Sequence, residues 1–309
     1  MPDLPLATSP QIFDRALMRA RQRRAAGLGP VTFLLDRVAD EFADRLNAVT
    51  RRFDIAVDLG TPGDAVARVL ARSPSIGKAF RSGFASDGQQ NTVAADEEAL
   101  PFRDGSLDLI VSGLALQFVN DLPGVLVQIR RALKPDGLFL AALLGGDTLT
   151  ELRQSFAAAE SELEDGASPH VAPFADLREL GSLLQRAGFA LPVTDVDRVT
   201  VRYGTAFDLM RDLRRMGATN ALVARRRTPL RRATLLRTAE VYAERFADPD
   251  GRLRATSRSS GCRAGRRIPI SRSRCSRVRP RRGLPTRSAR ARSRRERSLM
   301  KDRCRGLTG

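Results

Sequence analysis

Residues 107–146 show the clearest alternation of strand and helix signals in the chain. The segment begins with an apolar run at 107–112 (LDLIVS), continues with helical spacing in LPGVLVQIRRALKPDG, and ends with a second apolar run, LFLAALLGG. Short apolar runs bounded by turn residues are typical of buried strands. Because parallel strands need a crossover connection, usually a helix, this order predicts a parallel β-sheet covered by helices.

The same alternation extends in both directions from this segment. A strand is expected at 53–60 (FDIAVDLG), a helix at 65–71, and weaker strands near 78–84 and just before Asp96. Amphipathic helices are predicted at 12–26 and 31–49, and further helices at 147–165, 174–189, 206–218 and 229–246, with a strand at 191–203. The sequence therefore predicts an N-terminal helical segment (1–50) followed by an α/β domain (51–255).

The net charge of +18 is concentrated in the last part of the chain. Residues 256–309 contain 18 Arg and 1 Lys against two acidic residues, a net charge of +17. Their Arg, Ser, Gly and Pro show no periodicity, which predicts a disordered tail. An Arg-rich arm can bind phosphate backbones, but this one has no aromatic residue for base stacking, so nucleic acid is not the expected partner.

The location of the protein is addressed only indirectly by the sequence. No apolar run approaches the roughly 20 residues of a membrane helix, so no transmembrane segment is expected. The N-terminal region is Arg-rich and amphipathic like an organelle transit peptide, but Asp3 and Asp14 interrupt it, which favours a surface helix. We expect a cytoplasmic protein if the source is bacterial and a mitochondrial matrix protein if it is eukaryotic.

A ligand site is expected where the strand order of the sheet reverses, beside the carboxyl ends of the strands. The glycine turn after the strand at 53–60 would let the backbone approach a nucleotide. An acidic residue on a neighbouring strand can accept hydrogen bonds from ribose hydroxyls or an adenine amino group. The predicted cofactor-binding residues are Asp58, Gly60, Gly63, Asp96, Glu97 and Ser112.

Several motifs together carry a family resemblance. VDLG, ADEEALPF (95–102), LDLIVSGLALQFVNDLP (107–123) and ALKPDGLFLAAL (132–143) resemble class I S-adenosylmethionine-dependent methyltransferases. GGDTLTELR (145–153), AESELEDGASPHVAPF (159–174), LLQRAGF (183–189) and FDLMRDLRRMGATNAL (207–222) are similar to the mitochondrial complex I assembly factor 5 family and its alphaproteobacterial relatives. The resemblance implies a Rossmann-like sheet of seven strands, one of them antiparallel, with helices on both faces and S-adenosylmethionine as cofactor.

Three functions follow from this resemblance. The first is methyl transfer from S-adenosylmethionine to a protein or small-molecule substrate. The second is hydroxylation of an arginine on a respiratory complex I subunit, although one histidine cannot supply a centre of two His and one acid, so no metal site is expected. The third is a non-catalytic assembly factor that uses the fold as a docking surface.

The cofactor turn departs from the family pattern D-x-G-x-G-x-G. Pro62 and Asp64 occupy the second and third glycine positions. Pro62 offers no backbone N–H, and Asp64 would bring a negative charge near the carboxylate of the cofactor. Alternatively, Asp64 is simply an N-cap for the following helix. The second strand also lacks the acid that usually binds the ribose, so weakened cofactor binding is expected.

Two residues are weak catalytic candidates. Gln117 stands where mitochondrial relatives have His, and we expect it to line the pocket. His170, the only histidine, lies in SPHVAPF, a segment that this fold is expected to place over the substrate. A single histidine is also compatible with a purely structural role.

The end of the chain raises a separate question. The family continues past Thr256 with an apolar, aromatic stretch that supplies the last strand, whereas SRSSGCRAGRR follows here, with Cys262, Cys275 and Cys304 in no zinc or disulfide pattern. We therefore expect the last strand to be lost, and low solubility from the exposed sheet edge. A reading-frame slip near Thr256 explains the change of composition better than a functional basic arm.

Overall fold

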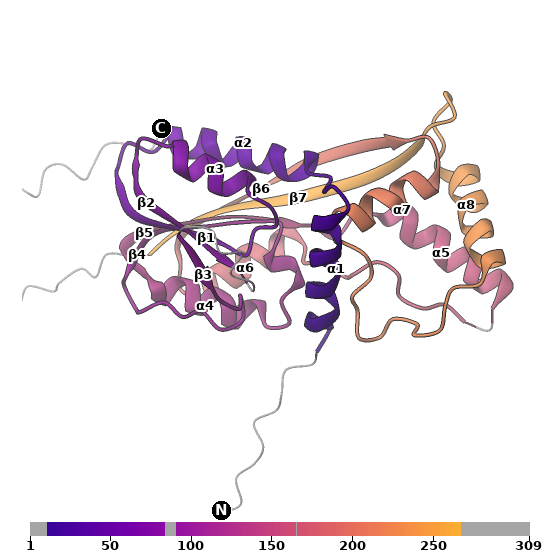
Figure 1. Cartoon of the computed structure of the whole chain (residues 1–309), viewed down its shortest axis with the longest axis horizontal. Coiled ribbons are helices and arrows are strands. Elements are labelled where there is room, and N and C mark those ends of the chain that lie inside the picture. The colour runs from indigo at the N-terminus through magenta and orange to yellow at the C-terminus, as the bar shows by residue number, and fades with distance from the viewer. Residues whose placement is uncertain (1–10, 84–90, 165, 267–309) are drawn as a thin grey trace, which may run out of the picture. The chain divides into compact units, whose positions relative to one another are not determined.

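The computed structural model describes residues 11–83, 91–164 and 166–266. Its centre is a seven-stranded sheet with the order β3-β2-β1-β4-β5-β7-β6 (Figure 1). The strands are β1 (Phe53–Leu59), β2 (Ile76–Gly83), β3 (Thr92–Ala94), β4 (Leu107–Gly113), β5 (Leu133–Leu144), β6 (Ala190–Tyr203) and β7 (Leu253–Gly265). β7 runs antiparallel to both neighbours, and the other pairs are parallel. The expected Rossmann-like sheet with one antiparallel strand is confirmed.

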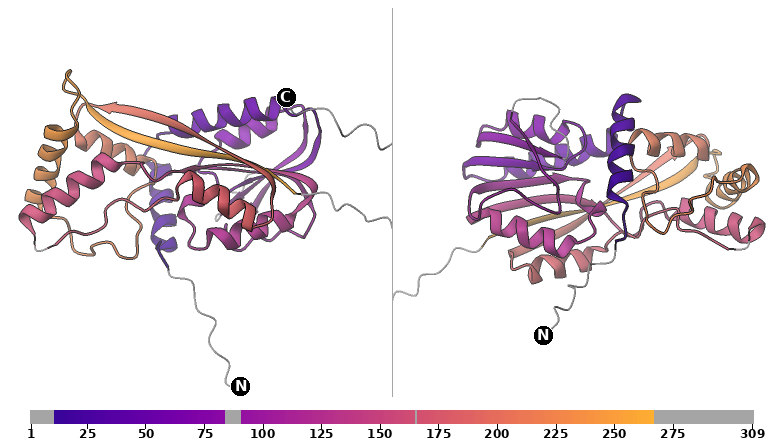
Figure 2. Two further views of the ribbon diagram at one scale, coloured as in Figure 1. Left: turned by 180° about the vertical axis from the view of Figure 1, so that it is seen from behind. Right: turned by 60° about the horizontal axis from the view of Figure 1, so that its bottom comes forward.

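Eight helices are described, and they cover both faces of the sheet as expected (Figures 1 and 2). α2 (Phe33–Asn47) and α3 (Ala65–Arg72) pack on one face, where Phe42 and Leu46 meet Phe53 and Leu109. α4 (Leu122–Ala132) and α6 (Leu177–Arg186) pack on the other face. The remaining helices are α1 (Arg15–Gly27), α5 (Thr150–Leu163), α7 (Ala206–Arg215) and α8 (Arg232–Phe246), besides the short 3-10 turn η1 (Leu116–Phe118).

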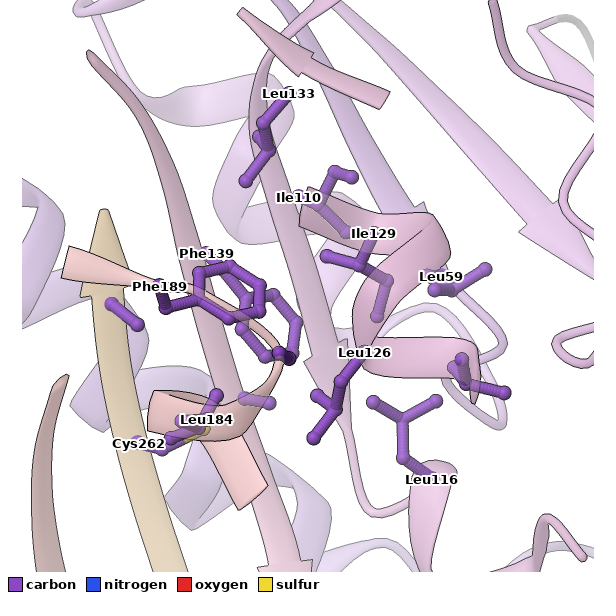
Figure 3. Close-up of a cluster of buried hydrophobic side chains, with 14 of the residues drawn as sticks. Leu59, Ile110, Leu116, Leu126, Ile129, Leu133, Phe139, Leu184, Phe189 and Cys262 are labelled. Carbon is purple, nitrogen blue, oxygen red and sulfur yellow. The ribbon is translucent and has the colours of Figure 1, made fainter. Parts of the chain in front are cut away.

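Figure 3 shows the larger of the apolar clusters, beneath α4 and α6. Ile129 of α4 and Leu184 of α6 lie over the strands, and Phe139 of β5 stacks on Phe189 with ring centroids 5.6 Å apart. These side chains come from alternate positions of the strands and from one face of each helix, as the hydrophobic periodicity predicts. The cluster holds β4 and β5 rigidly, and with them the loops at their carboxyl ends.

α5, α7 and α8 lie together near the end of β6 and the start of β7 (Figure 1). A third apolar cluster packs between these elements. Phe156 of α5, Leu209 of α7 and Tyr242 of α8 meet there. The Tyr242 hydroxyl donates to the backbone oxygen of Arg254 at 2.7 Å, so this buried phenol is satisfied. The cluster brings the segment around His170 close to the sheet.

One boundary differs from the sequence prediction. The helix expected to continue to Pro135 and Gly137 ends at Ala132, and β5 begins directly with Leu133. Asp136 takes a left-handed backbone conformation, φ +64°, and the pairing of β4 with β5 shifts register there. The turn residues therefore mark an irregularity inside the strand and not the end of the helix.

The expectations of disorder from Thr256 and of a lost last strand are wrong for residues 256–265. These residues belong to β7, whose Cys262 is paired with Ala141 of β5 and with Thr194 of β6. Small side chains such as Ser260, Cys262 and Ala264 face the buried side, so the strand forms without large apolar residues. The predicted domain boundary at 256 falls inside this strand, and residues 267–309 lie outside the described ranges.

Candidate cofactor and acceptor site

The glycine turn lies at the switch point of the sheet. β1 neighbours β2 on one side and β4 on the other, so the turn after β1 meets the carboxyl ends of both. The Gly60 N–H donates to the Ser82 oxygen at 2.7 Å, and the Ser112 hydroxyl donates to the Leu59 oxygen at 2.8 Å. The Gly113 N–H donates to the Thr61 hydroxyl at 2.9 Å. Ser112 is thus near the turn and supports its backbone.

The two glycines of the turn both have left-handed backbones, with φ of +70° at Gly60 and +71° at Gly63. A β-carbon at Gly60 would lie 2.7 Å from the Glu97 carboxylate, whereas the nearest atom at Gly63 would be 3.9 Å away. Gly60 is therefore required both for its conformation and for the approach of Glu97. The structure brings this part of the predicted cofactor site together.

The two unusual turn residues differ in their surroundings. Pro62 is half-buried, and the Asp64 side chain is 60% exposed and forms an ion pair with Arg68 at 2.7 Å. Asp64 does stand at the N-cap position of α3, but its carboxylate makes no capping hydrogen bond. Its negative charge is therefore matched by Arg68 on the surface of α3.

Asp58 is the least satisfied charged group near the turn. It is 1% exposed, and neither carboxylate oxygen reaches full hydrogen-bond geometry within the described ranges, although the Thr61 hydroxyl and N–H lie close enough to interact with it. Burial raises the pKa of Asp58 to about 7, although Thr61 and Arg81 act in the opposite direction. A buried acceptor without a donor is costly, so this carboxylate is suited to a ligand that brings an N–H or a positive charge.

The acidic pair Asp96 and Glu97 is held by the N-terminal helix. Arg15 of α1 binds Asp96 at 2.6 Å and also pairs with Glu97, and Arg19 pairs with Asp96. Burial raises the pKa of Asp96, but the Glu98 N–H and the two arginines outweigh it and leave the value lowered. Sequence reasoning missed both arginines, because α1 precedes the domain and its only signal was an Arg-rich amphipathic pattern.

Gln117 lies in η1 and is buried. Its side-chain N–H donates to the backbone oxygen of Leu114 at 2.8 Å, while its side-chain oxygen has no partner within the described residues. Leu114 has φ +50°, so the amide supports an unfavourable left-handed backbone directly after β4. The side chain is not among those lining the cavity described next.

An aromatic cavity of about 190 Å³ lies beside the acidic pair. Its walls include Phe13, Phe118, Phe156, Phe174 and His170. Arg15 connects the two places, because it binds Glu97 and also donates to the Phe118 oxygen at 3.4 Å. Arg15 thus contacts both Glu97, which lies against Gly60, and Phe118 of the cavity wall.

The residues around the turn fit S-adenosylmethionine. The left-handed glycine backbone and the buried carboxylate of Asp58 are suited to an adenosyl group with an ammonium end. Asp96 and Glu97 offer further acceptor oxygens, although both are paired with arginines of α1. Within the described ranges no three His, Cys, Asp or Glu side chains form a set that could hold a metal ion. None of the helices described there combines the length and apolar character that crossing a bilayer requires.

Comparison with known proteins agrees with this geometry. The family model of a methyltransferase domain matches residues 55–141, which confirms the expected resemblance to methyltransferases and S-adenosylmethionine as the cofactor. The Homo sapiens protein named "Arginine-hydroxylase NDUFAF5, mitochondrial" is 42% identical over 265 residues, covering 81% of this chain and 76% of that protein. A malonyl-[acyl-carrier protein] O-methyltransferase of Laribacter hongkongensis is 37% identical over 264 residues, covering 79% of this chain and 86% of that protein.

Solved structures support the fold alone. A protein of Bacillus halodurans and the YcgJ protein of Bacillus subtilis each align with a TM-score of 0.51, at 16% and 15% identity. These alignments cover 74% and 75% of this chain, and 98% and 99% of the two Bacillus chains.

Proposed function

We propose a methyltransferase function for this chain, which belongs to the family of the mitochondrial arginine-hydroxylase NDUFAF5 proteins. The observation that carries the proposal is the buried Asp58 carboxylate, which has no fully formed hydrogen bond within the described ranges, next to the left-handed turn at the switch point. The domain match at residues 55–141 and the similarity to an O-methyltransferase support it. The cofactor is S-adenosylmethionine, which supplies an electrophilic methyl group.

The chain contributes mainly binding and orientation. Gly60 and Gly63 provide backbone without side chains, Asp58 accepts from the cationic end of the cofactor, and Asp96 and Glu97 accept from its hydroxyl or amino groups. Ser112 fixes the turn through the Leu59 oxygen. Holding the acceptor in line with an activated methyl group is by itself a large catalytic effect. The aromatic cavity with His170 is the acceptor side of the site.

The acceptor is a protein or a small molecule, and the relatives suggest two kinds. The human relative is named an arginine hydroxylase, and the Laribacter relative acts on a carrier-bound malonyl group. Identity of 42% over 81% of the chain also favours a second candidate function, hydroxylation of an arginine on a respiratory complex I subunit. A mitochondrial or bacterial cytoplasmic location is compatible with either function.

A third candidate is a docking factor without catalysis. The ion pairs of Arg15 and Arg19 with Asp96 and Glu97 favour it, since they engage the acidic pair before any ligand arrives. Under this alternative the helix α1 closes the crevice permanently.

Calorimetric titration with S-adenosylmethionine and S-adenosylhomocysteine tests the proposal. We expect both compounds to bind the wild type. Asp58→Asn should lower the affinity for S-adenosylmethionine by about tenfold or more, the effect of losing one charged hydrogen bond. Asp64→Asn is the matched control, because that carboxylate faces solvent, and its affinity should stay within about twofold of the wild type. Absence of heat from the wild type would overturn the proposal in favour of docking. Mass spectrometry of an arginine peptide then distinguishes an added methyl from an added hydroxyl.

A further inference from the structure

The second half of the site contains a buried carboxylate–imidazole pair. Glu160 of α5 is 0% exposed, and its carboxylate lies 2.7 Å from His170 Nε2. The same carboxylate accepts from the Ser168 backbone N–H at 2.6 Å and from the Ser168 hydroxyl at 3.1 Å. Burial raises the pKa of Glu160, but the hydrogen bonds from His170 and Ser168 outweigh it, so the value is lowered. Glu160 is therefore an ionised acceptor surrounded by donors.

This arrangement determines which imidazole nitrogen carries the proton. When the imidazole is neutral, Nε2 faces the carboxylate and donates to it, so Nδ1 is then the nitrogen with a free lone pair. Nδ1 has no hydrogen-bond partner within the described residues. The ring itself lines the aromatic cavity and stacks on Phe156, with centroids 4.0 Å apart and planes at 11°. An oriented base thus borders a space lined mainly by apolar side chains, together with Thr219 and Asn220.

The pair is not a serine nucleophile relay. In such a relay the serine and the acid bind opposite nitrogens of the imidazole. Here Ser168 Oγ and Glu160 both approach Nε2, at 3.2 and 2.7 Å. His170 consequently cannot pass a proton between them, and its useful atom is Nδ1.

The charges around the cavity favour an acceptor that becomes negative. Three arginines donate to backbone oxygens of the cavity wall: Arg15 to Phe118 at 3.4 Å, Arg153 to Ala172 at 3.4 Å, and Arg21 to Asn220. The one carboxylate beside His170 is already occupied by its own donors. Arg15 is already paired with Asp96 and Glu97, but the positive charges of Arg153 and Arg21 at this wall favour a guest that becomes negative over one that is already positive.

We propose that this cavity binds a flat, apolar acceptor bearing a weakly acidic hydroxyl, such as a phenol, and that Nδ1 of His170 removes its proton. The step rests on the proposed methyltransferase function. The acceptor O–H bond breaks and its proton goes to Nδ1, while the oxygen bonds to the methyl carbon. The bond from that carbon to the cofactor sulfur breaks, leaving the electron pair on sulfur, and the imidazolium later returns its proton to water. Glu160 is a positioning residue that fixes the tautomer.

The unique histidine allows a test on the unmodified full-length chain. Nitrogen-15 NMR of the imidazole needs no assignment by mutagenesis, because the chain contains one His. We expect the free protein to show the Nε2–H tautomer. Added p-cresol should bind in the cavity and shift the Nδ1 signal. Toluene should bind in the cavity with little effect on the Nδ1 signal, and methylguanidinium should neither bind nor shift it. A protonated Nδ1 in the free protein, or a response to methylguanidinium instead of p-cresol, would overturn the assignment.

Variants then distinguish the role of His170 as the base from that of Glu160 as the positioning residue. His170→Gln should bind S-adenosylhomocysteine like the wild type but p-cresol about tenfold more weakly, the loss of one buried hydrogen bond. Glu160→Gln should give mixed tautomers in the nitrogen spectrum, a signature that a merely structural role would not produce. Normal p-cresol binding by His170→Gln contradicts the pocket. Failure of wild-type cofactor binding with an intact p-cresol response contradicts only the methyltransferase function.

Discussion

Asp58 makes stability depend on pH in an unusual direction for a carboxylate. Its pKa in the folded protein is about 7, above the value of about 3.9 of an unfolded chain, because burial disfavours the charge. Between these values the folded state holds more protons than the unfolded state. Its contribution to stability is therefore complete below about pH 4 and is lost as the pH rises towards 7.

The Asp58→Asn variant isolates this contribution. We expect the variant to gain stability relative to the wild type as the pH rises from about 4 to about 7, by at most roughly 4 kcal/mol, with no further change above that. Urea denaturation of both proteins across this range measures the difference. A difference independent of pH would show that Asp58 is ionised throughout. Asp64→Asn serves as the exposed control.

Arg15 compensates a buried charge, so its loss should be costly. The Arg15 and Glu97 side chains are only 11% and 12% exposed. Arg15→Met keeps the length of the side chain but leaves Glu97 without its partner, and we expect a loss of roughly 3–5 kcal/mol in the free energy of unfolding. Arg37→Met is the matched control, since its pair with Asp197 lies on the surface. Equal losses in the two variants would mean that burial of the pair is not what matters.

The residues of the site were predictable only in part. Asp58, Gly60, Asp96 and Glu97 could be placed together, because they follow strands whose carboxyl ends meet at one edge of a sheet. Arg15 could not, because its partner Glu97 is 82 residues away and no local periodicity encodes that contact. The pairing of Asp64 with Arg68 was also missed, since a carboxylate at this position can bind either the backbone N–H groups of the helix N-terminus or a surface arginine.

At the scale of elements, periodicity predicted the helices and most of the strands. It failed for β7, whose sequence is mostly Arg, Ser, Gly and Ala and lacks the Val, Ile and aromatic residues of an ordinary strand. Strand formation there depends on β5 and β6, which supply ladder partners on both sides. Such tertiary context cannot be deduced from a local window. The reading-frame slip near Thr256 stays a prediction, which independent transcript sequences test.

A buried serine of β7, Ser260, can be compared with a buried serine of β4, Ser112. Ser260 is 1% exposed and its hydroxyl has no partner within the described ranges, whereas Ser112 is 0% exposed and bonded to Leu59. We expect Ser260→Ala to stabilise the protein by roughly 1 kcal/mol, because an unsatisfied hydroxyl is removed, and Ser112→Ala to destabilise it by a similar amount. Thermal melts of the two variants measure the opposite signs. A loss of stability in Ser260→Ala would indicate that its hydroxyl is bonded.

At the scale of the whole molecule, β7 determines how far towards the C-terminus the chain must extend to complete the sheet. The sheet's last described contact is the Arg266 N–H donating to the Gly137 oxygen at 2.9 Å, just beyond β7. Arg258 and Arg263, two of the arginines of the basic segment 256–309, lie within β7 and therefore belong to the sheet.

Two truncations test this dependence. A chain ending after Pro269 keeps all of β7, so its melting temperature should match that of the full chain. A chain ending after Thr256 loses most of β7, which separates β6 from β5, leaves their backbone groups unpaired, and exposes the apolar cluster around Phe139 and Leu184. We expect that chain to aggregate and to show no cooperative transition by scanning calorimetry, because an open hydrophobic edge promotes association. Cooperative melting of the shorter chain at the temperature of the longer one would mean that β7 contributes little to the fold.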